Sequence, residues 1–180
     1  MIIFISIILL LICVVAFFVV IFNFVGSFMT GVPFMSSDQK GVDIVLPTME
    51  LAPGSTICDL GCGKAQILIH AYKKYGCQGI GYELSIWPYI LARINVWLAR
   101  ADVKIYFANF FQADLGQVDV IYCYLFPKIM ERLEGKLKRE LKSGVRMVSY
   151  VFKLPSINPE KIITTNTDKG DFGKFYVYRF

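Results

Sequence analysis

No Lys, Arg, Asp, Glu or His occurs before Asp38 in this 180-residue chain. The uncharged region includes residues 2–22, IIFISIILLLICVVAFFVVIF, which are almost wholly apolar. About 20 apolar residues suffice for a helix to cross the roughly 30 Å hydrocarbon core of a bilayer. A secretory signal peptide is the alternative, but a basic start, a shorter apolar stretch and a small-residue cleavage site are not evident. We therefore predict one transmembrane helix as an anchor over residues 1–25, and a linker over residues 26–37.

Basic residues are absent from the N-terminal flank of the predicted anchor, whereas all 19 Lys and Arg residues follow it. The positive-inside tendency then places the downstream domain in the cytoplasm. The five cysteines form no disulfide framework that we identify, which suits a reducing compartment. We predict a single-pass membrane protein whose main domain is cytoplasmic.

Histidine is nearly absent, since His70 is the only one. No arrangement of Cys with His, or of Ser with His, points to nucleophilic catalysis. Cys58 and Cys62 lack a second pair of ligands, so no metal site is predicted. A dense cluster of basic and aromatic residues is also lacking, and we expect no nucleic acid partner. The net charge of +5 lies on the domain after the anchor and favours contact with anionic lipid headgroups.

After the linker, short apolar runs alternate with helical patterns. Helices are predicted from Ala65 to Tyr75, from Ser85 to about Arg100, and from Pro127 to Lys142. The second of these carries an apolar stripe on one face, made of Trp87, Ile90, Leu91, Ile94 and Leu98. The third has charged residues outside and an inward stripe made of Ile129, Met130, Leu133, Leu137 and Leu141.

Seven short apolar runs predict strands: STICDL, CQGIGYEL, VKIYFANFF, VDVIYCYLF, VRMVSYVF, EKIITTNT and KFYVYRF. Strands that alternate with helices indicate a parallel sheet. The last two runs are separated only by a turn that contains Gly and Asp, which indicates an antiparallel hairpin. We predict an α/β domain over residues 38–180, with a doubly wound, Rossmann-like sheet of seven strands and a C-terminal antiparallel hairpin.

The stretch TICDLGCGKAQILIHAY, residues 56–72, joins the first predicted strand to the first helix through two glycines, Gly61 and Gly63. Glycines at this place let the backbone approach a ligand, and the following helix offers free N–H groups. The second strand ends in Glu83, where an acid can accept hydrogen bonds from both hydroxyls of a ribose. The pattern predicts a nucleotide site, and it fits NAD as well as S-adenosylmethionine.

Three observations favour S-adenosylmethionine. Asp59 stands two residues before the first glycine, where a carboxylate suits a cationic ligand and repels a pyrophosphate. Gln66 stands where a dinucleotide fingerprint has its third glycine. A domain of about 140 residues also leaves little room for a separate dehydrogenase substrate domain.

With DLGCGKAQILI and GIGYEL, residues 31–180 resemble the class I, seven-stranded S-adenosylmethionine-dependent methyltransferases. More narrowly, the chain resembles the small membrane-anchored lysine methyltransferases that include the ATP synthase c-subunit methyltransferases. Those proteins also have an N-terminal hydrophobic segment and a motif Pro-aromatic-x-Pro-Thr, which here is Pro33-Phe34-Met35-Ser36-Ser37. The stretch YLFPKIMERLEGKLKREL is similar to the Pro-led helix that follows the fourth strand in that family.

The resemblance implies a role for each matching residue. Ser37 would belong to the cofactor site, and Asp59, Gly61 and Gly63 would line the methionine part of the cofactor. Glu83 would hold the ribose, and Asn109 and Phe110 would flank the adenine. After the fourth strand, Leu125, Phe126 and Pro127 would face the substrate, and Tyr124 is the candidate catalytic residue.

The chain departs from the family pattern at Lys64, Ala65 and Ser36. A cation near a sulfonium and near a helix N-terminus is unfavourable, so we expect Lys64 to point to solvent. The implied function is a membrane-anchored, S-adenosylmethionine-dependent protein-lysine methyltransferase with a membrane-associated protein substrate. A small-molecule or lipid methyltransferase on the same fold, and a non-enzymatic membrane protein with a vestigial cofactor pocket, remain open at this point.

Overall fold

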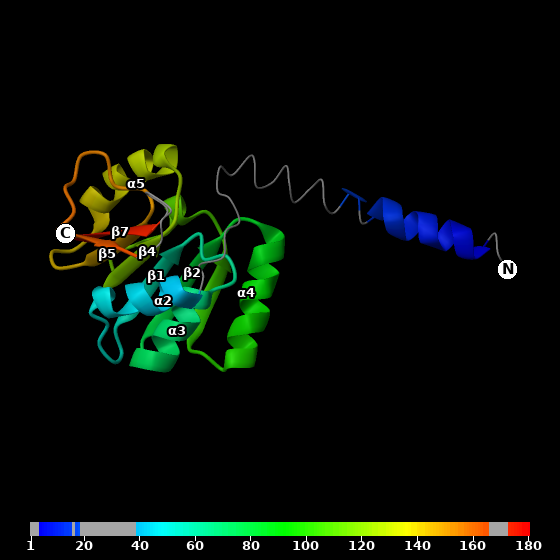
Figure 1. Ribbon diagram of the computed structural model, residues 1–180, viewed down its shortest axis with the longest axis horizontal. Helices are drawn as coiled ribbons and strands as arrows, with labels where there is room; N and C mark the ends of the chain where they lie inside the picture. The colour runs from blue at the N-terminus through cyan, green and yellow to red at the C-terminus, as the bar shows by residue number, and fades with distance from the viewer. Residues whose placement is uncertain (1–3, 16, 19–38, 166–172) are drawn as a thin grey trace. The chain divides into compact units, whose positions relative to one another are not determined.

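The computed structural model describes residues 4–15, 17–18, 39–165 and 173–180 (Figure 1). The chain divides into two compact units, Met1–Pro33 and Phe34–Phe180. Residues 4–15 and 17–18 of the first unit are helical. Within the described residues, no helix combines the length and the apolar character needed to cross a bilayer. Part of the predicted anchor, the predicted linker and Ser37 lie outside the described residues.

The second unit is built on a seven-stranded sheet with the order β3-β2-β1-β4-β5-β7-β6. Its strands are β1 Thr56–Leu60, β2 Gln78–Glu83, β3 Val103–Phe107, β4 Val120–Cys123, β5 Arg146–Tyr150, β6 Lys161–Thr164 and β7 Lys174–Arg179. Strands β1 to β5 pair in parallel, and β7 pairs antiparallel with both β5 and β6. The predicted Rossmann-like sheet and its antiparallel C-terminal strands are confirmed.

Helices cover both faces of this sheet, as expected of a doubly wound domain. The helices are α2 Gln39–Val45, α3 Gln66–Tyr75, α4 Ile86–Ala99 and α5 Pro127–Glu140, with short 3-10 turns η1 Leu46–Met49 and η2 Phe110–Gln112. In Figure 1, α3 and α4 lie on one side of the sheet and α5 on the other. Strand β4 is buried along its whole length, as its continuous apolar run predicted.

Helix α5 packs as its sequence predicted, because Met130, Leu133 and Leu137 of its apolar stripe are fully buried. Its buried Lys136 donates a hydrogen bond through Nζ to the carbonyl oxygen of Ala113 at 2.6 Å and pairs with Glu140. The charged side of the helix faces outward. This helix begins at Pro127, directly after the loop that follows β4, and so fixes where that loop leaves the sheet.

Helix α4 is oriented differently from an ordinary amphipathic helix. An apolar stripe normally faces the core, but here the stripe residues Trp87, Ile90, Ile94 and Leu98 are exposed. The buried residues of α4 are instead the small Pro88 and Ala92. Strands β2 and β3, which α4 connects, form one edge of the sheet. The helix therefore contacts the sheet through a narrow inner side, and its apolar stripe lies outside.

Candidate active site

The turn after β1 has the backbone conformation that its two glycines allow. Gly61 has φ 86° and Gly63 has φ 54°, in the left-handed region that side chains other than glycine rarely adopt. The backbone N–H groups of Gly61 and Cys62 both donate to the carbonyl oxygen of Tyr82, at 2.9 and 3.0 Å. A Cβ at Gly61 would lie 3.5 Å from Leu125 Cδ2. The turn is thus held at the end of β2, with little room around Gly61.

Ala65 occupies a position that favours glycine. It precedes α3 with φ 61°, and its side chain is fully buried. The departure from the family pattern therefore leaves the turn in its left-handed form, with the methyl group in the core. Lys64 is half-buried, whereas we expected it to point to solvent. Its carbonyl oxygen accepts a hydrogen bond from Asn95 Nδ2 at 3.1 Å, which ties the turn to α4.

Glu83, the last residue of β2, reaches back to the glycine turn. Its Oε2 accepts a hydrogen bond from the backbone N–H of Gly63 at 3.0 Å, and its Oε1 accepts one from the backbone N–H of Ser85 at 2.8 Å. Each carboxylate oxygen can accept more than one hydrogen bond. The structure therefore brings Glu83 and Gly63 together, as the predicted site requires, and keeps acceptor capacity for a ligand.

Asp59 lies on β1 beside this turn and is 4% exposed. Burial, together with the nearby charge of Glu83, raises the pKa of its carboxyl to about 8. Removal of a carboxylate from water without a cation nearby disfavours its charged form. A cationic ligand at this place would restore the carboxylate. The two acids thus form a pair whose environment suits positive charge.

The raised pKa of Asp59 predicts a pH-dependent cost in stability. An unfolded Asp releases its proton near pH 4, whereas the folded protein holds it until about pH 8, so stability falls as the pH rises through this window. The Asp59→Asn variant does not titrate. We expect it to melt at least about 3 °C above the parent at about pH 9, equivalent to about 1 kcal/mol, with a smaller difference at about pH 4. Calorimetric melting curves of both proteins test this, and equal curves at the higher pH would contradict it.

The end of β3 provides the next part of the site. Asn109 Oδ1 accepts a hydrogen bond from the backbone N–H of Phe111 at 3.0 Å and so starts η2. Phe110 is 7% exposed, and its ring centroid lies 4.6 Å from that of Phe111. Asn109 thus supports the loop with its oxygen. Phe110 contributes mainly to the core under the loop, and the adenine role of both residues stays a prediction.

Aromatic side chains gather where β4 and β5 end. Tyr124 lies 5.0 Å from Tyr150 and 6.3 Å from Phe152 between ring centroids, and Phe126 lies 5.9 Å from Phe152. We call Tyr124, Phe126, Tyr150 and Phe152 the aromatic wall. Sequence reasoning missed its β5 half, although the rule that ligands bind beyond the carboxyl ends of parallel strands applies to β5 as well.

Two local features shape the aromatic wall. Val151 has φ 67°, which is unusual for a β-branched residue and turns the chain sharply after β5. Ser149 Oγ then donates to the carbonyl oxygen of Phe152 and closes this turn. Leu125, predicted to face the substrate, is 1% exposed and fills the space over Gly61. It forms the floor between the glycine turn and the wall.

Tyr124 keeps its proton at neutral pH. Burial raises the pKa of the Tyr124 phenol, and the neighbouring Tyr150 adds to the shift. A phenol with a raised pKa is a poor general base, but its oxygen still accepts a hydrogen bond and its ring still attracts cations. Pro127 is the exposed first residue of α5 and lies next to the wall in the chain.

Together, the sheet order, the glycine turn after β1 and the acid at the end of β2 define a class I methyltransferase fold. The sequence pattern of the ANTKMT methyltransferase domain family matches residues 59–161. The chain belongs to this family.

Several characterised proteins are similar to the chain. It is 32% identical over 143 residues to the adenine nucleotide translocase lysine N-methyltransferase of Mus musculus, covering 77% of this chain and 61% of the mouse protein. It is 30% identical over 140 residues to a protein-lysine N-methyltransferase of Saccharolobus islandicus (strain REY15A), covering 76% and 87%. The ATP synthase c-subunit lysine N-methyltransferase of Homo sapiens is 28% identical over 138 residues, covering 76% and 58%. The chain thus spans about three fifths of the two mammalian relatives.

A solved structure supports the fold. The RNA methyltransferase from Salinibacter ruber, in complex with S-adenosyl-L-homocysteine, superposes with a TM-score of 0.75 at 24% identity, covering 81% of this chain and 93% of that one. At this identity the likeness concerns the fold alone. S-adenosylmethionine is the cofactor expected for the family, and the positive-φ glycine turn and the two acids beside it fit such a ligand.

Proposed function

We propose that this chain is an S-adenosylmethionine-dependent protein-lysine N-methyltransferase that acts on a membrane-associated protein. The observation that carries the proposal is the glycine turn with Asp59 on one side and Glu83 hydrogen-bonded to Gly63 on the other. The similarity to a protein-lysine N-methyltransferase over 87% of that protein supports the lysine substrate. The names of the mouse and human relatives support a target embedded in a membrane.

Each part of the site has one task in this proposal. When bound, S-adenosylmethionine supplies a methyl group that its sulfonium already activates. Gly61 and Gly63 allow the backbone to approach the cofactor, Glu83 holds its ribose, and the Asp59 carboxylate compensates its positive charge. Asn109 offers its amide nitrogen to the adenine. Little further side-chain chemistry is needed, because alignment of the nucleophile supplies most of the rate.

The aromatic wall would receive the lysine. Its rings attract an ammonium group through cation–π interactions. The same apolar surroundings disfavour the charged amine and lower its pKa, which promotes the neutral nucleophile. Tyr124 would direct the amine by accepting a hydrogen bond rather than by removing its proton as a tyrosinate. The released proton would pass to water.

Substitutions in the aromatic wall test this role. We expect Phe152→Ala to lower kcat/KM for the protein substrate by about tenfold or more, because a cation–π contact of about 1–2 kcal/mol is lost. We expect Tyr124→Phe to retain more activity than Tyr124→Ala, since the ring is kept. Cofactor affinity, measured by titration calorimetry, should not change in these variants. A loss of cofactor binding in Phe152→Ala would show that the wall belongs to the cofactor site instead.

The N-terminal segment would anchor the enzyme to the bilayer, with the methyltransferase domain, residues 38–180, on the cytoplasmic side. The apolar run of residues 2–22 and the absence of charge before Asp38 support the anchor. An anchor confines the enzyme to its target's membrane and raises the effective concentration of substrate. Alkaline extraction of membranes that carry the full chain tests this. Release into the supernatant would contradict it.

A lipid substrate is the main alternative, and methyl labelling separates the two. Membranes are incubated with the purified full chain and S-adenosylmethionine labelled on its methyl group, and protein and lipid fractions are then separated. We expect label in the protein fraction. Label confined to the lipid fraction would replace our proposal with a lipid methyltransferase, and cofactor binding without any transfer would favour a vestigial site.

A further inference from the structure

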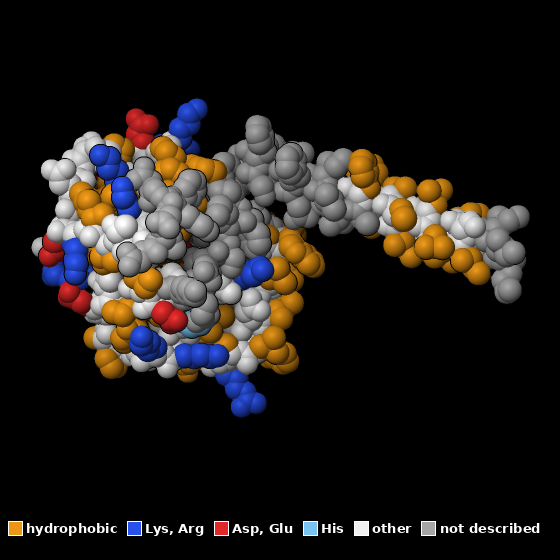
Figure 2. Space-filling view, in the orientation of Figure 1, with side chains coloured by type: hydrophobic (Ala, Val, Ile, Leu, Met, Phe, Trp, Pro, Cys, Tyr) orange, Lys and Arg blue, Asp and Glu red, His pale blue; other side chains and the backbone are white. Residues whose placement is uncertain are grey.

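The outward side of α4 is an exposed apolar surface. We call it the α4 face, and it consists of Ile86, Trp87, Ile90, Ile94, Trp97 and Leu98. Trp97 is 76% exposed, Leu98 66% and Trp87 54%. Figure 2 shows hydrophobic side chains gathered over this helix. Exposed apolar surface of this extent normally marks a contact with a partner or a membrane.

The composition of the α4 face favours a lipid surface over a protein. Both tryptophans of the chain lie on it, and tryptophan and tyrosine are enriched at the boundary between headgroups and acyl chains. Helix α4 contains no Asp or Glu, whereas Arg93 lies within it and Arg100 caps its end. A helix with large apolar residues on one side and arginines at its margins has the character of an interfacial helix.

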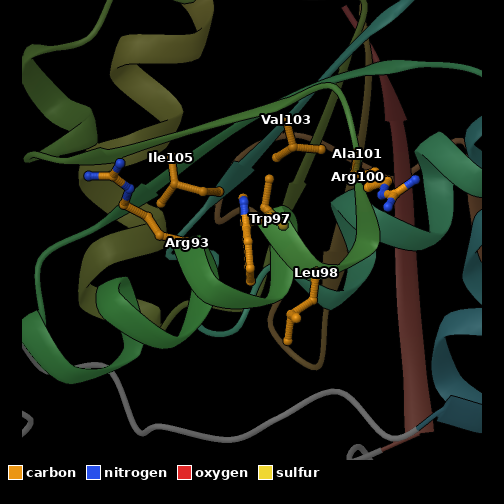
Figure 3. Close-up of a pocket in the computed structure, with 8 residues that line it drawn as sticks. Arg93, Trp97, Leu98, Arg100, Ala101, Val103 and Ile105 are labelled. Atoms are coloured by element: carbon orange, nitrogen blue, oxygen red, sulfur yellow. The ribbon is translucent and has the colours of Figure 1, made fainter.

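A groove beside the helix joins these charges to the apolar surface. It has a volume of about 650 Å³ and lies between α4 and β3. Its lining includes Arg93, Trp97, Leu98, Arg100, Val103 and Ile105. Figure 3 shows Trp97 between Arg93 and Arg100. The groove is therefore apolar in the middle and basic at both ends, which is complementary to acyl chains below anionic headgroups.

The charges around the groove are mainly positive. Lys104 on β3 is exposed and adds to Arg93 and Arg100. Asp102, which follows Arg100 by two residues, is exposed as well and is outnumbered by the three cations. The local charge thus favours an anionic surface over a neutral one.

The α4 face adjoins the candidate active site. Phe107 at the end of β3 is exposed and pairs in register with Glu83. Its ring lies 5.3 Å from that of Tyr89 in the first turn of α4. The apolar surface thus extends to the carboxyl edge of the sheet, where Glu83 meets the glycine turn. A surface that rests against the α4 face would also lie next to this edge.

We propose that the α4 face docks onto an anionic lipid bilayer, with Trp87 and Trp97 at the boundary between headgroups and acyl chains and Arg93 and Arg100 at lipid phosphates. This contact is separate from the proposed N-terminal anchor and does not depend on methyl transfer. It sets the orientation of the domain on the membrane. If the chain is a methyltransferase, the contact turns the carboxyl edge of the sheet toward targets in the same membrane.

Tryptophan fluorescence of the full chain tests this proposal directly, because both tryptophans of the chain lie on α4. The protein is reconstituted in vesicles of phosphatidylcholine mixed with phosphatidylglycerol, and in vesicles of phosphatidylcholine alone. Part of the lipid carries bromine on the upper acyl chain, which quenches tryptophan on contact. We expect more than about half of the emission to be quenched in anionic vesicles, since interfacial helices bury their apolar side about 5–10 Å deep.

Charge-reversal variants separate the α4 face from the anchor. The double variant Arg93→Glu with Arg100→Glu should lose most of the quenching while it remains in the vesicles. The matched control, Lys128→Glu with Arg139→Glu, makes the same charge change on the exposed side of α5 and should quench like the parent. Absence of quenching in the parent, equal quenching in the Arg93/Arg100 variant, or a blue-shifted emission without quenching would overturn the proposal. The last result would show that protein covers the face.

Discussion

The Glu83→Ala variant is expected to lose at least about 100-fold in affinity for S-adenosylmethionine. Hydrogen bonds to a charged group contribute about 1.5–3 kcal/mol each, and the two ribose hydroxyls would lose such an acceptor. The variant also loses the acceptor for the Gly63 and Ser85 N–H groups, which hold the glycine turn beside the end of β2. Titration calorimetry of the full chain measures the affinity.

Two control variants show whether the effect is specific. Glu83→Gln keeps an oxygen that can accept from the backbone but lacks the charge, so we expect a smaller loss of about tenfold. Glu160→Ala removes an exposed acid that pairs with Arg179 at the opposite edge of the sheet, and it should bind like the parent. If Glu83→Ala bound the cofactor as tightly as the parent, the assignment of the site would be wrong.

The affinity for S-adenosylmethionine should also depend strongly on pH. Asp59 is protonated in the free protein below about pH 8, whereas a cationic ligand beside it favours the carboxylate. Binding must then release a proton, and the affinity should rise by about tenfold per pH unit as the pH approaches 8 and level off above it. Calorimetry in buffers of different ionisation enthalpy would detect the release of about one proton.

The Asp59→Asn variant is the control for this prediction. It retains the size of the side chain but has no proton to release, so its affinity should be lower above about pH 8 and nearly constant below it. A slope that is the same in parent and variant would assign the titration to another group. The same variant serves the stability measurement, so both consequences of burying Asp59 can be compared in one protein.

The sequence predicted the sheet well because its strands are short apolar runs between clear breaks. The run VDVIYCYLF predicted a central strand, and β4 is indeed buried along its length between β1 and β5. The pairing of Gly63 with Glu83 also followed from the sequence, because neighbouring parallel strands end at one edge. Long-range order was therefore predictable where local pattern and topology agree.

The orientation of α4 could not be predicted in the same way. Periodicity shows that Trp87, Ile90 and Ile94 share a face, but it does not show what covers that face. Only the position of β3 at the sheet edge shows that the stripe lies outside. The β5 half of the aromatic wall was missed for a related reason, because Val151 leaves the regular strand conformation and places Phe152 near Tyr124.

The most direct measurement of the central claim is the chemical identity of the methylated group. Membrane proteins labelled by the full chain with methyl-labelled S-adenosylmethionine are hydrolysed to amino acids and separated. Our account predicts label in N-methylated lysine, and its absence when the Glu83→Ala variant replaces the parent. Label in any other amino acid or only in lipid, or equal labelling by the variant, would contradict it.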